Sequence, residues 1–196
     1  TVTVSNAAAP PPPAGSQTLT VTIAAGADDA YEDNGYDAAS PEAWMGFWNG
    51  NNEQIGLRFA NVTIPKNAVI SSAILTVQSS ATEDDSNTVQ AKIRAKAVDN
   101  AASWAAGTNS PSQPPYTTSG VDWDNGPWAG NAAQISPNLA SVIQELVTRS
   151  GWTTGNAIGL VLLNDGTALN ADRGITMFEG GTPASLTIIY STTGTP

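Results

Sequence analysis

Short segments in which polar and apolar residues alternate constrain the fold of this chain more than any other feature. The segment QTLTVTI at 17–23 is the clearest case, because Leu19, Val21 and Ile23 fall on one side of an extended backbone. A period of two is typical of a strand with one buried face. Further strands are predicted at 55–64, 69–80, 88–98, 156–164, 175–178 and 184–190. The segments 69–80 and 88–98 are expected to be antiparallel strands joined by a polar turn.

One segment has a helical period instead. Apolar residues recur at helical spacing from Leu139 to Val147, Ser136 is a suitable N-cap, and Pro137 suits the first helical position. The sequence therefore predicts one short helix at about 137–149. Many short strands with one helix predict an all-β fold, an antiparallel two-sheet sandwich of jelly-roll type. The stretches 25–53 and 101–130 are expected to be mostly irregular loops.

Composition excludes several classes of function. The chain has 196 residues, a net charge of -10, and neither His nor Cys. Ser-His-Asp and Cys-His catalysis and His-ligated zinc sites are therefore impossible, and we expect a non-enzymatic protein. The acidic balance argues against nucleic-acid binding, and no apolar run is long enough to span a membrane. Gly, Ser, Thr and Asn on the surface favour a secreted protein, which we expect to be extracellular after removal of a signal peptide.

The first residues form a separate arm. TVTVSN, Thr1–Asn6, alternates like a strand, with Val2 and Val4 on one face, and residues 7–16 form a spacer around the prolines. The predicted assembly strand is Thr1, Val2, Thr3, Val4, Ser5 and Asn6, and the stiff part of the spacer is Pro10, Pro11, Pro12 and Pro13. Four prolines in polyproline II hold the strand away from the segment that follows. The expected organisation is an arm at 1–16, a sandwich at 17–191 and a tail at 192–196.

Several motifs resemble one family. They are DDAYED at 28–33, IGLRFANVTIPKNAVISSAILTV at 55–77, VDWDNGPW at 121–128, GWTTGNAIGLVLLN at 151–164 and DRGITMFEGGTPASLTIIY at 172–190. In this order they resemble the DNRLRE-type domains, secreted bacterial β-sandwiches related to carbohydrate-binding modules that include alginate binders. The resemblance implies a secreted sandwich from a surface protein, lyase, adhesin or cell-wall protein, and it suggests core positions for Trp123 and Trp152. It does not cover residues 1–16.

Large aromatic side chains in the two long loops are candidates for ligand or subunit contacts, because rings stack on sugars and often mark interfaces. These candidates are Trp44, Phe47, Trp48, Trp104, Tyr116 and Trp128. Pinning of the loops is the alternative role. A carboxylated sugar such as alginate needs basic groups, and Lys92, Arg94 and Lys96 alternate along one predicted strand. That basic row could equally meet the acids of a neighbouring subunit or simply protect an exposed sheet face.

An acidic loop is the candidate metal site. Calcium prefers several oxygen ligands from short loops, and the possible ligands are Asp28, Asp29, Glu32, Asp33 and Asp37. No regular calcium-loop spacing is present, so solvated turn acids are the alternative interpretation. No other cofactor is predicted.

The arm decides between the functional hypotheses. A portable strand beyond a stiff spacer favours strand addition to another copy, and a head-to-tail contact of this kind builds open fibres. The sequence therefore predicts a structural subunit of an extracellular filament or surface layer, with further copies of itself as partners. The alternative is a carbohydrate-binding module, which could depend on calcium and would belong to a polysaccharide-active or adhesive protein. The sequence leaves open whether the strand docks in its own chain or in the next one.

Overall fold

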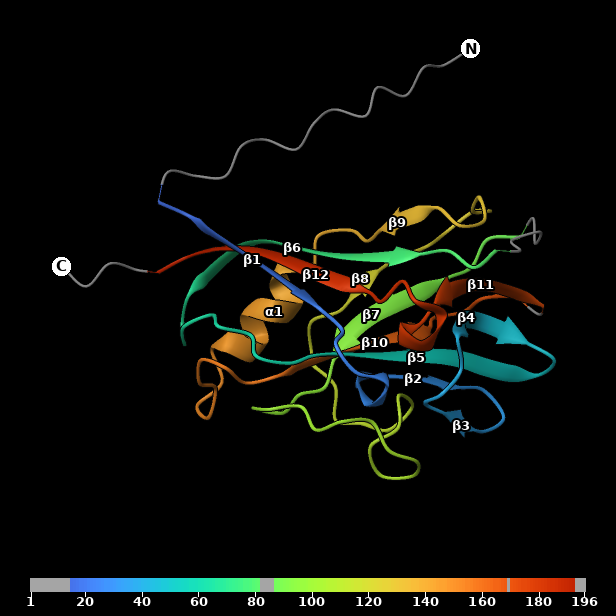
Figure 1. Cartoon of the computed structure of the whole chain (residues 1–196), viewed down its shortest axis with the longest axis horizontal. Helices are drawn as coiled ribbons and strands as arrows, with labels where there is room; N and C mark the ends of the chain where they lie inside the picture. The colour runs from blue at the N-terminus through green and yellow to red at the C-terminus, as the bar shows by residue number, and fades with distance from the viewer. Residues whose placement is uncertain (1–14, 82–86, 169, 193–196) are drawn as a thin grey trace, which may run out of the picture.

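A computed structural model of the chain describes residues 15–81, 87–168 and 170–192. Two antiparallel sheets face one another in these residues, which confirms the predicted all-β sandwich (Figure 1). The predicted assembly strand Thr1–Asn6 and the prolines Pro10–Pro13 lie outside the described residues. No helix in the described ranges is long and apolar enough to cross a membrane.

The smaller sheet has four strands. In spatial order they are β1 (Gln17–Thr22), β12 (Ser185–Ser191), β6 (Val69–Gln78) and β9 (Ala133–Ile135). None of these four strands contains a charged residue. In a chain with a net charge of -10, this sheet is therefore an uncharged wall of the molecule.

The larger sheet has eight strands. Its main path is β11 (Ala171–Thr176), β4 (Glu42–Trp48), β5 (Asn51–Phe59), β10 (Ile158–Asn164), β7 (Ala91–Ala95) and β8 (Val121–Asp122). Off this path, β2 (Asp29–Glu32) pairs with both β5 and β3 (Tyr36–Asp37). The strand β5 pairs with β4 through its first three residues and with β2 through the next four. Strands β2, β4 and β5 therefore meet at one end of the sandwich.

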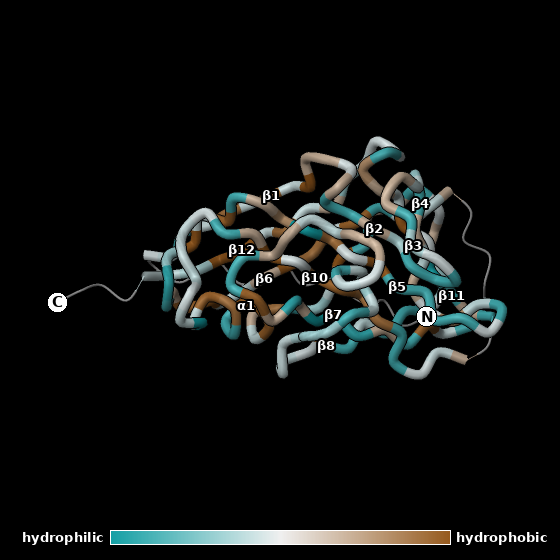
Figure 2. The backbone as a smooth tube through the Cα atoms, turned by 90° about the horizontal axis from the view of Figure 1, so that it is seen from below, coloured by the Kyte–Doolittle hydropathy of each residue, from teal (hydrophilic) through white to brown (hydrophobic). Residues whose placement is uncertain are grey.

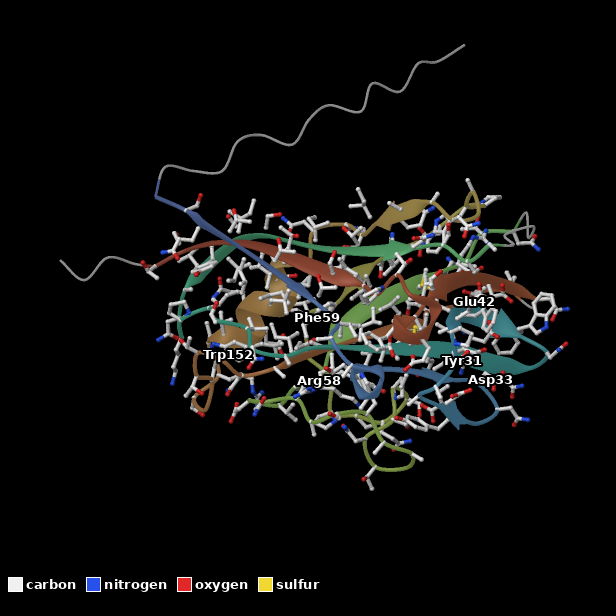
Figure 3. The ribbon with its side chains drawn as sticks, in the orientation of Figure 1. Tyr31, Asp33, Glu42, Arg58, Phe59 and Trp152 are labelled. Atoms are coloured by element: carbon white, nitrogen blue, oxygen red, sulfur yellow. The ribbon has the colours of Figure 1, made fainter. Side chains whose placement is uncertain are left out.

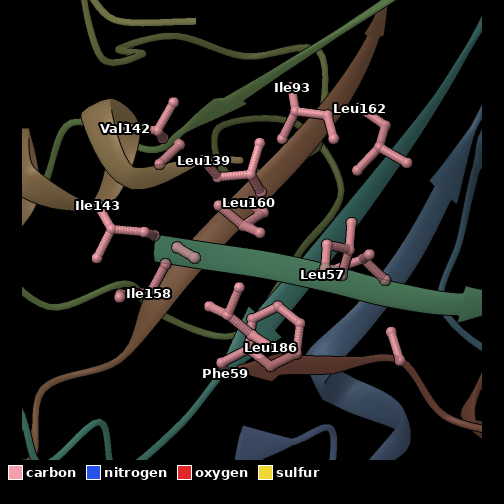
Figure 4. Packing of buried hydrophobic residues seen from close by; sticks show 14 of the residues in the cluster. Leu57, Phe59, Ile93, Leu139, Val142, Ile143, Ile158, Leu160, Leu162 and Leu186 are labelled. Carbon is pink, nitrogen blue, oxygen red and sulfur yellow. The ribbon is translucent and has the colours of Figure 1, made fainter. Parts of the chain in front are cut away.

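The core lies between the sheets and under the helix. Alternate residues of β5, β10 and β12 meet there, among them Leu57, Leu160 and Leu186, and the helix adds Val142 and Ile143 (Figure 4). Hydrophobic residues lie in the interior along β6, β10 and the helix, whereas many residues of the outer loops are hydrophilic (Figure 2). Trp123 and Trp152 are buried in this core, as predicted.

The helix is shorter than predicted. The α-helix α1 covers Ala140–Val147, flanked by Leu139 and Thr148, and two 3-10 turns lie elsewhere, η1 (Gly26–Asp28) and η2 (Phe178–Gly180). Ser136 is not an N-cap, because its backbone N–H donates to the Leu75 carbonyl and its Oγ accepts from the Leu75 N–H. Pairing with β6 thus keeps the chain extended at the position where the sequence predicts the first helical turn.

Two other sequence predictions were wrong. The segments 69–80 and 88–98 do not pair, because β6 belongs to the smaller sheet and β7 to the larger one. β6 and β7 pack their apolar faces against the same core from its two opposite sides. Alternation of polar and apolar residues is the same in this arrangement as in a hairpin, so it cannot distinguish the two. The stretch 25–53 is not irregular, since it contains β2, β3 and β4. The predicted strand 55–64 is represented by β5, which begins earlier and ends at Phe59.

Candidate functional site

The first candidate site is the open edge of the smaller sheet at β1. This strand pairs with β12 on one side, and no other strand of the described residues pairs with it. Leu19 and Val21 point toward the core but are only half-buried. The strand contains neither charge nor proline, the residues by which natural edge strands usually avoid further pairing.

The hydrogen-bond pattern identifies the backbone groups that this edge offers. The Ile23 N–H donates to the Ala184 carbonyl at 3.0 Å, directly beyond the paired residues Thr22 and Ser185. Hydrogen-bonded pairs alternate along an antiparallel ladder. The N–H and C=O groups of Thr18, Thr20 and Thr22 therefore point away from β12. The contact between the Thr20 and Thr187 hydroxyls, at 3.0 Å, agrees with this assignment, because side chains lie closer at such positions.

The second candidate site lies at the end of the sandwich where β2, β4, β5 and β11 meet. We call Tyr31, Trp44, Glu53 and Asp172 the end cluster. The Tyr31 hydroxyl donates to Glu53 Oε1 at 2.7 Å, and the Trp44 ring meets the Tyr31 ring edge-on with centroids 5.6 Å apart. Figure 3 shows Tyr31 and Asp33 at this end, far from Trp152.

Strand register brings the two carboxylates of the end cluster to one face. Asp172 lies opposite Gly46 on β4, and Gly46 lies opposite Glu53 on β5. The α-carbons of Asp172 and Glu53 are therefore about 10 Å apart, twice the strand spacing. Gly46 has a φ of 138°, and a Cβ there would overlap the Ala171 carbonyl oxygen. Only glycine fits this close approach of β4 to β11.

Glu53 is the most unusual acid of the end cluster. Glu53 is only 4% exposed, and its Oε2 is buried with no hydrogen-bond partner in the described part of the chain. Burial, with smaller contributions from the charges of Asp172 and Asp33, raises the pKa of Glu53 to about 7, although the hydrogen bond from the Tyr31 hydroxyl acts in the opposite direction. Burial and the bond to Glu53 also raise the pKa of Tyr31. The sequence does contain a signal of this burial. Glu53 continues the alternation of the apolar residues Ile55 and Leu57, so a strand that buries those two residues also turns Glu53 inward.

The five acids predicted to bind calcium take separate roles. Asp28 pairs with Arg58, and the Asp29 Oδ2 accepts from the Phe178 N–H at 2.8 Å. Glu32 accepts from the Ser112 N–H, whereas Asp33 and Asp37 accept from the backbone of their own turns. Across the described residues, no three acidic side chains lie close enough together to hold a metal ion.

Asp29 shares the unusual state of Glu53. It is buried, and its Oδ1 has no partner among the described residues. Burial raises the pKa of Asp29 to about 7, with smaller raising effects from Glu179 and Asp28, although the Phe178 N–H acts in the opposite direction. Two carboxyl groups of this protein therefore change their charge near neutral pH.

The six candidate aromatics do not form one platform. Trp104 is 6% exposed and donates from Nε1 to the Asp28 carbonyl at 3.2 Å, so it pins its loop to the sheet. Tyr116 is half-buried and donates to the Pro111 carbonyl at 2.8 Å. Trp128 is half-buried against Trp123, with ring centroids 5.6 Å apart. Trp44 and Phe47 are half-buried and Trp48 is 42% exposed; all three belong to β4.

The predicted basic row on β7 has protein partners at all three positions. Lys92 pairs with Asp165 at 2.6 Å and with Asp122 at 3.2 Å, and Arg94 donates to the Thr117 carbonyl at 2.7 Å. Lys96, which follows β7, is only 4% exposed. Its Nζ donates to the carbonyls of Ser110 and Gln113 and lies 5.5 Å from the Trp104 ring centroid and 5.3 Å from that of Tyr116. The row is therefore occupied by internal contacts.

Because Lys96 is buried, we expect the protein to become more stable as the pH rises above 8. Burial lowers the pKa of Lys96 from 10.5 to about 8, although nearby Glu32 acts in the opposite direction. Between these values the unfolded chain binds more protons than the folded one, so stability increases with pH. We expect the free energy of unfolding to rise by about 1 to 2 kcal/mol between pH 8 and pH 9.5. Urea titrations check this, with Lys96→Met as the comparison; an equal rise in that variant would assign the effect to another group.

Comparisons with known proteins do not place the chain in a family. No family model matches it, and neither does any curated protein. Among solved structures, it is similar to one described as the structure of infectious bursal disease virus Gx strain, with a TM-score of 0.36 and 16% identity. The match covers 92% of this chain and 33% of the viral chain, so this protein spans about a third of that length. At this TM-score the likeness carries no functional argument, and membership of the DNRLRE-type family stays a prediction.

Proposed function

We propose that this protein is a structural subunit of an extracellular filament or surface layer, and that the edge at β1 accepts a strand from a neighbouring copy. The observation that carries the proposal is this open, uncharged edge, with the half-buried side chains of Leu19 and Val21 beside it. An added strand would satisfy the outward backbone groups of Thr18, Thr20 and Thr22. It would also cover the apolar rim of the core.

The segment Thr1–Asn6 has a suitable sequence for the added strand. TVTVS repeats the pattern of Thr18–Thr22, TLTVT, with small hydroxyl residues on one face and aliphatic residues on the other. Paired beside β1, Val2 and Val4 of the incoming strand would flank Leu19 and Val21. Because no strand of the smaller sheet is charged, a second copy can approach this wall with less repulsion than elsewhere on an acidic molecule.

The test compares two substitutions at one edge position. Thr20→Pro removes an outward N–H without removing a bond to β12, whereas Thr20→Val keeps that N–H and serves as the matched control. Both variants lose the hydroxyl contact with Thr187. Electron microscopy and sedimentation should show filaments for the full chain and Thr20→Val, but mostly monomers for Thr20→Pro and for a chain lacking residues 1–14.

Each outcome has a defined meaning. Normal filaments from the chain lacking residues 1–14 would refute assembly through the arm. If that deletion prevents assembly and Thr20→Pro does not, the arm docks on another edge. Monomers of the full chain at all concentrations would reject the subunit function.

A further inference from the structure

The outer face of the smaller sheet is a surface that strand addition at the β1 edge does not use. The strands β6, β9 and β12 lie along the upper side of the molecule in Figure 1, with the helix and the larger sheet below them. The inward side chains of this sheet belong to the core, whereas Ile74, Ile135 and Ile189 lie outside it. This face is therefore available for contact with another molecule.

The register of the strands aligns these three isoleucines. Ile74 on β6 lies opposite Thr187 on β12, which is two residues from Ile189. Ile135 on β9 lies opposite Thr76, which is two residues from Ile74 in the other direction. Residues two apart on a strand share a face, and diagonal neighbours on antiparallel strands lie about 7 to 8 Å apart. The isoleucines therefore form an aliphatic diagonal across β12, β6 and β9, with Ile74 at its centre.

This face holds most of the exposed apolar bulk of the described residues. Three large apolar side chains are exposed there, Trp48, Val69 and Ile135, and Ile135 is the most exposed of them at 64%. Val69 also belongs to the outer face, because it lies opposite Ser191, two residues from Ile189. Hydroxyl side chains surround the diagonal, among them Thr20, Ser72, Thr76, Ser185 and Thr187. An exposed apolar patch with a polar rim is typical of a protein interaction site.

Charge identifies a second copy of this chain as the partner. None of the four strands contains a charged residue, although the chain has a net charge of -10. Two copies therefore repel one another in most orientations and least when these faces meet. The diagonal also matches itself, because a two-fold axis through Ile74 sets Ile135 of one copy against Ile189 of the other. A basic partner finds no acidic side chain on these strands.

The size of the face limits the strength of this contact. Four strands about 4.8 Å apart, with paired segments of about seven residues at about 3.3 Å each, cover roughly 400 Å² in each copy. A stable interface buries about 800 Å² per partner, so one pair of copies associates weakly and reversibly. Copies that are already arrayed present many such faces together, and their contacts then reinforce one another.

We propose that the outer face of the smaller sheet binds the same face of a second copy, with the two aliphatic diagonals in contact and hydroxyl groups around them. The contact needs neither the N-terminal arm nor the edge at β1. In a filament or surface layer it joins neighbouring rows of subunits side by side, a role that rests on the proposed function.

The test exploits a sequence that contains no cysteine. Thr187→Cys places a single thiol opposite Ile74, and a short thiol–thiol crosslinker should join two full-length copies through it. Ile135→Lys in the same chain should slow this crosslinking at least about tenfold, because each pair loses two apolar contacts and gains two charges. Trp48→Lys is the matched control, since it changes another exposed apolar side chain to the same charge. Thr63→Cys, at an exposed position after β5, measures random crosslinking.

Each result supports or overturns the proposal. Crosslinking of Thr187→Cys that Ile135→Lys suppresses and Trp48→Lys leaves unchanged supports it. A rate no higher than that of Thr63→Cys overturns it, and so does an equal rate with and without Ile135→Lys. Because Ile135 is mostly exposed, its lysine variant is expected to fold. If the parent chain instead sediments with phosphatidylcholine vesicles and does not crosslink, the face belongs to a lipid surface.

Electron microscopy of the same samples reports on the proposed function separately. Filaments without crosslinks through Thr187→Cys refute only the contact between outer faces. Crosslinked pairs without filaments refute only assembly through the edge at β1. If both contacts are present, the parent filaments should lie side by side in bundles, and the filaments of Ile135→Lys should be single.

Discussion

Lowering the pH from 7 to 5 should raise the free energy of unfolding by about 2 to 4 kcal/mol. Most proteins gain no such stability on mild acidification, because their carboxylates are favoured by folding. Here two carboxyl groups, Asp29 and Glu53, are buried with one oxygen each that lacks a partner in the described residues. Burial raises the pKa of each to about 7.

The direction follows from proton binding. The reference pKa values are 3.8 for Asp29 and 4.5 for Glu53, so between pH 7 and pH 5 the folded chain takes up protons that the unfolded chain does not. Acid therefore stabilises the folded state across this window. The gain ends near pH 4.5, where the unfolded carboxyls also become protonated. Glu145 then acts in the opposite sense. Although burial raises the pKa of Glu145, the hydrogen bonds from the N–H groups of Ser119 and Thr118 together lower it below the usual value.

Neutral isosteres test the assignment. Asp29→Asn and Glu53→Gln should each remove about half of the pH dependence, and the double variant should unfold with nearly the same free energy at pH 5 and pH 7. Asp124→Asn is the control, because Asp124 is exposed and loses a charge without changing a buried group. Urea-induced unfolding followed by tryptophan fluorescence gives these free energies. A double variant that kept the full acid gain would show that the general relief of negative charge causes it.

Much of the fold could be predicted from the alternating segments, because each segment places its apolar residues on one face of an extended strand. Strands β1, β6, β10 and β12 coincide closely with their predicted segments for this reason. Pairing between segments was not predictable in the same way. The face of β7 that carries Ala91, Ile93 and Ala95 would be equally apolar in a hairpin with β6 or in the opposite sheet.

The site was less predictable because its properties come from contacts between distant segments. The string WMGFW indicated aromatic residues but not that Gly46 allows β4 to approach β11. Glu53 looked like one more acid at the end of a loop, and its bond to Tyr31 depends on β2 lying beside β5. For the same reason the sequence left the role of Trp104 open between a ligand platform, a subunit contact and pinning of its loop. It does not reveal that Gly56 and Gly159 in the sheet beneath leave room for the ring.

Trp104→Ala should lower the free energy of unfolding by about 3 to 5 kcal/mol, as expected for a buried tryptophan. The ring lies directly on Gly56, where a Cβ would approach its Cε2 to 2.6 Å, and its Nε1 donates to the Asp28 carbonyl. It also covers the Lys96 ammonium, which two carbonyls of the same loop hold in place. Removal of the indole thus opens a cavity and exposes a cation that has lost one of its aromatic neighbours.

The loop that carries Trp104 provides a second measurement. Residues 96–120 connect β7 to β8, and Trp104 and Tyr116 pack this loop against the outer face of the sheet. We expect a protease of broad specificity to cut this loop in Trp104→Ala and to spare it in the parent chain. Trp48→Ala, which removes an exposed ring, should change the free energy of unfolding by less than about 0.5 kcal/mol. Gly56→Ala should reproduce the cleavage by displacing the indole, and a protected loop in both core variants would contradict the pinning role of Trp104.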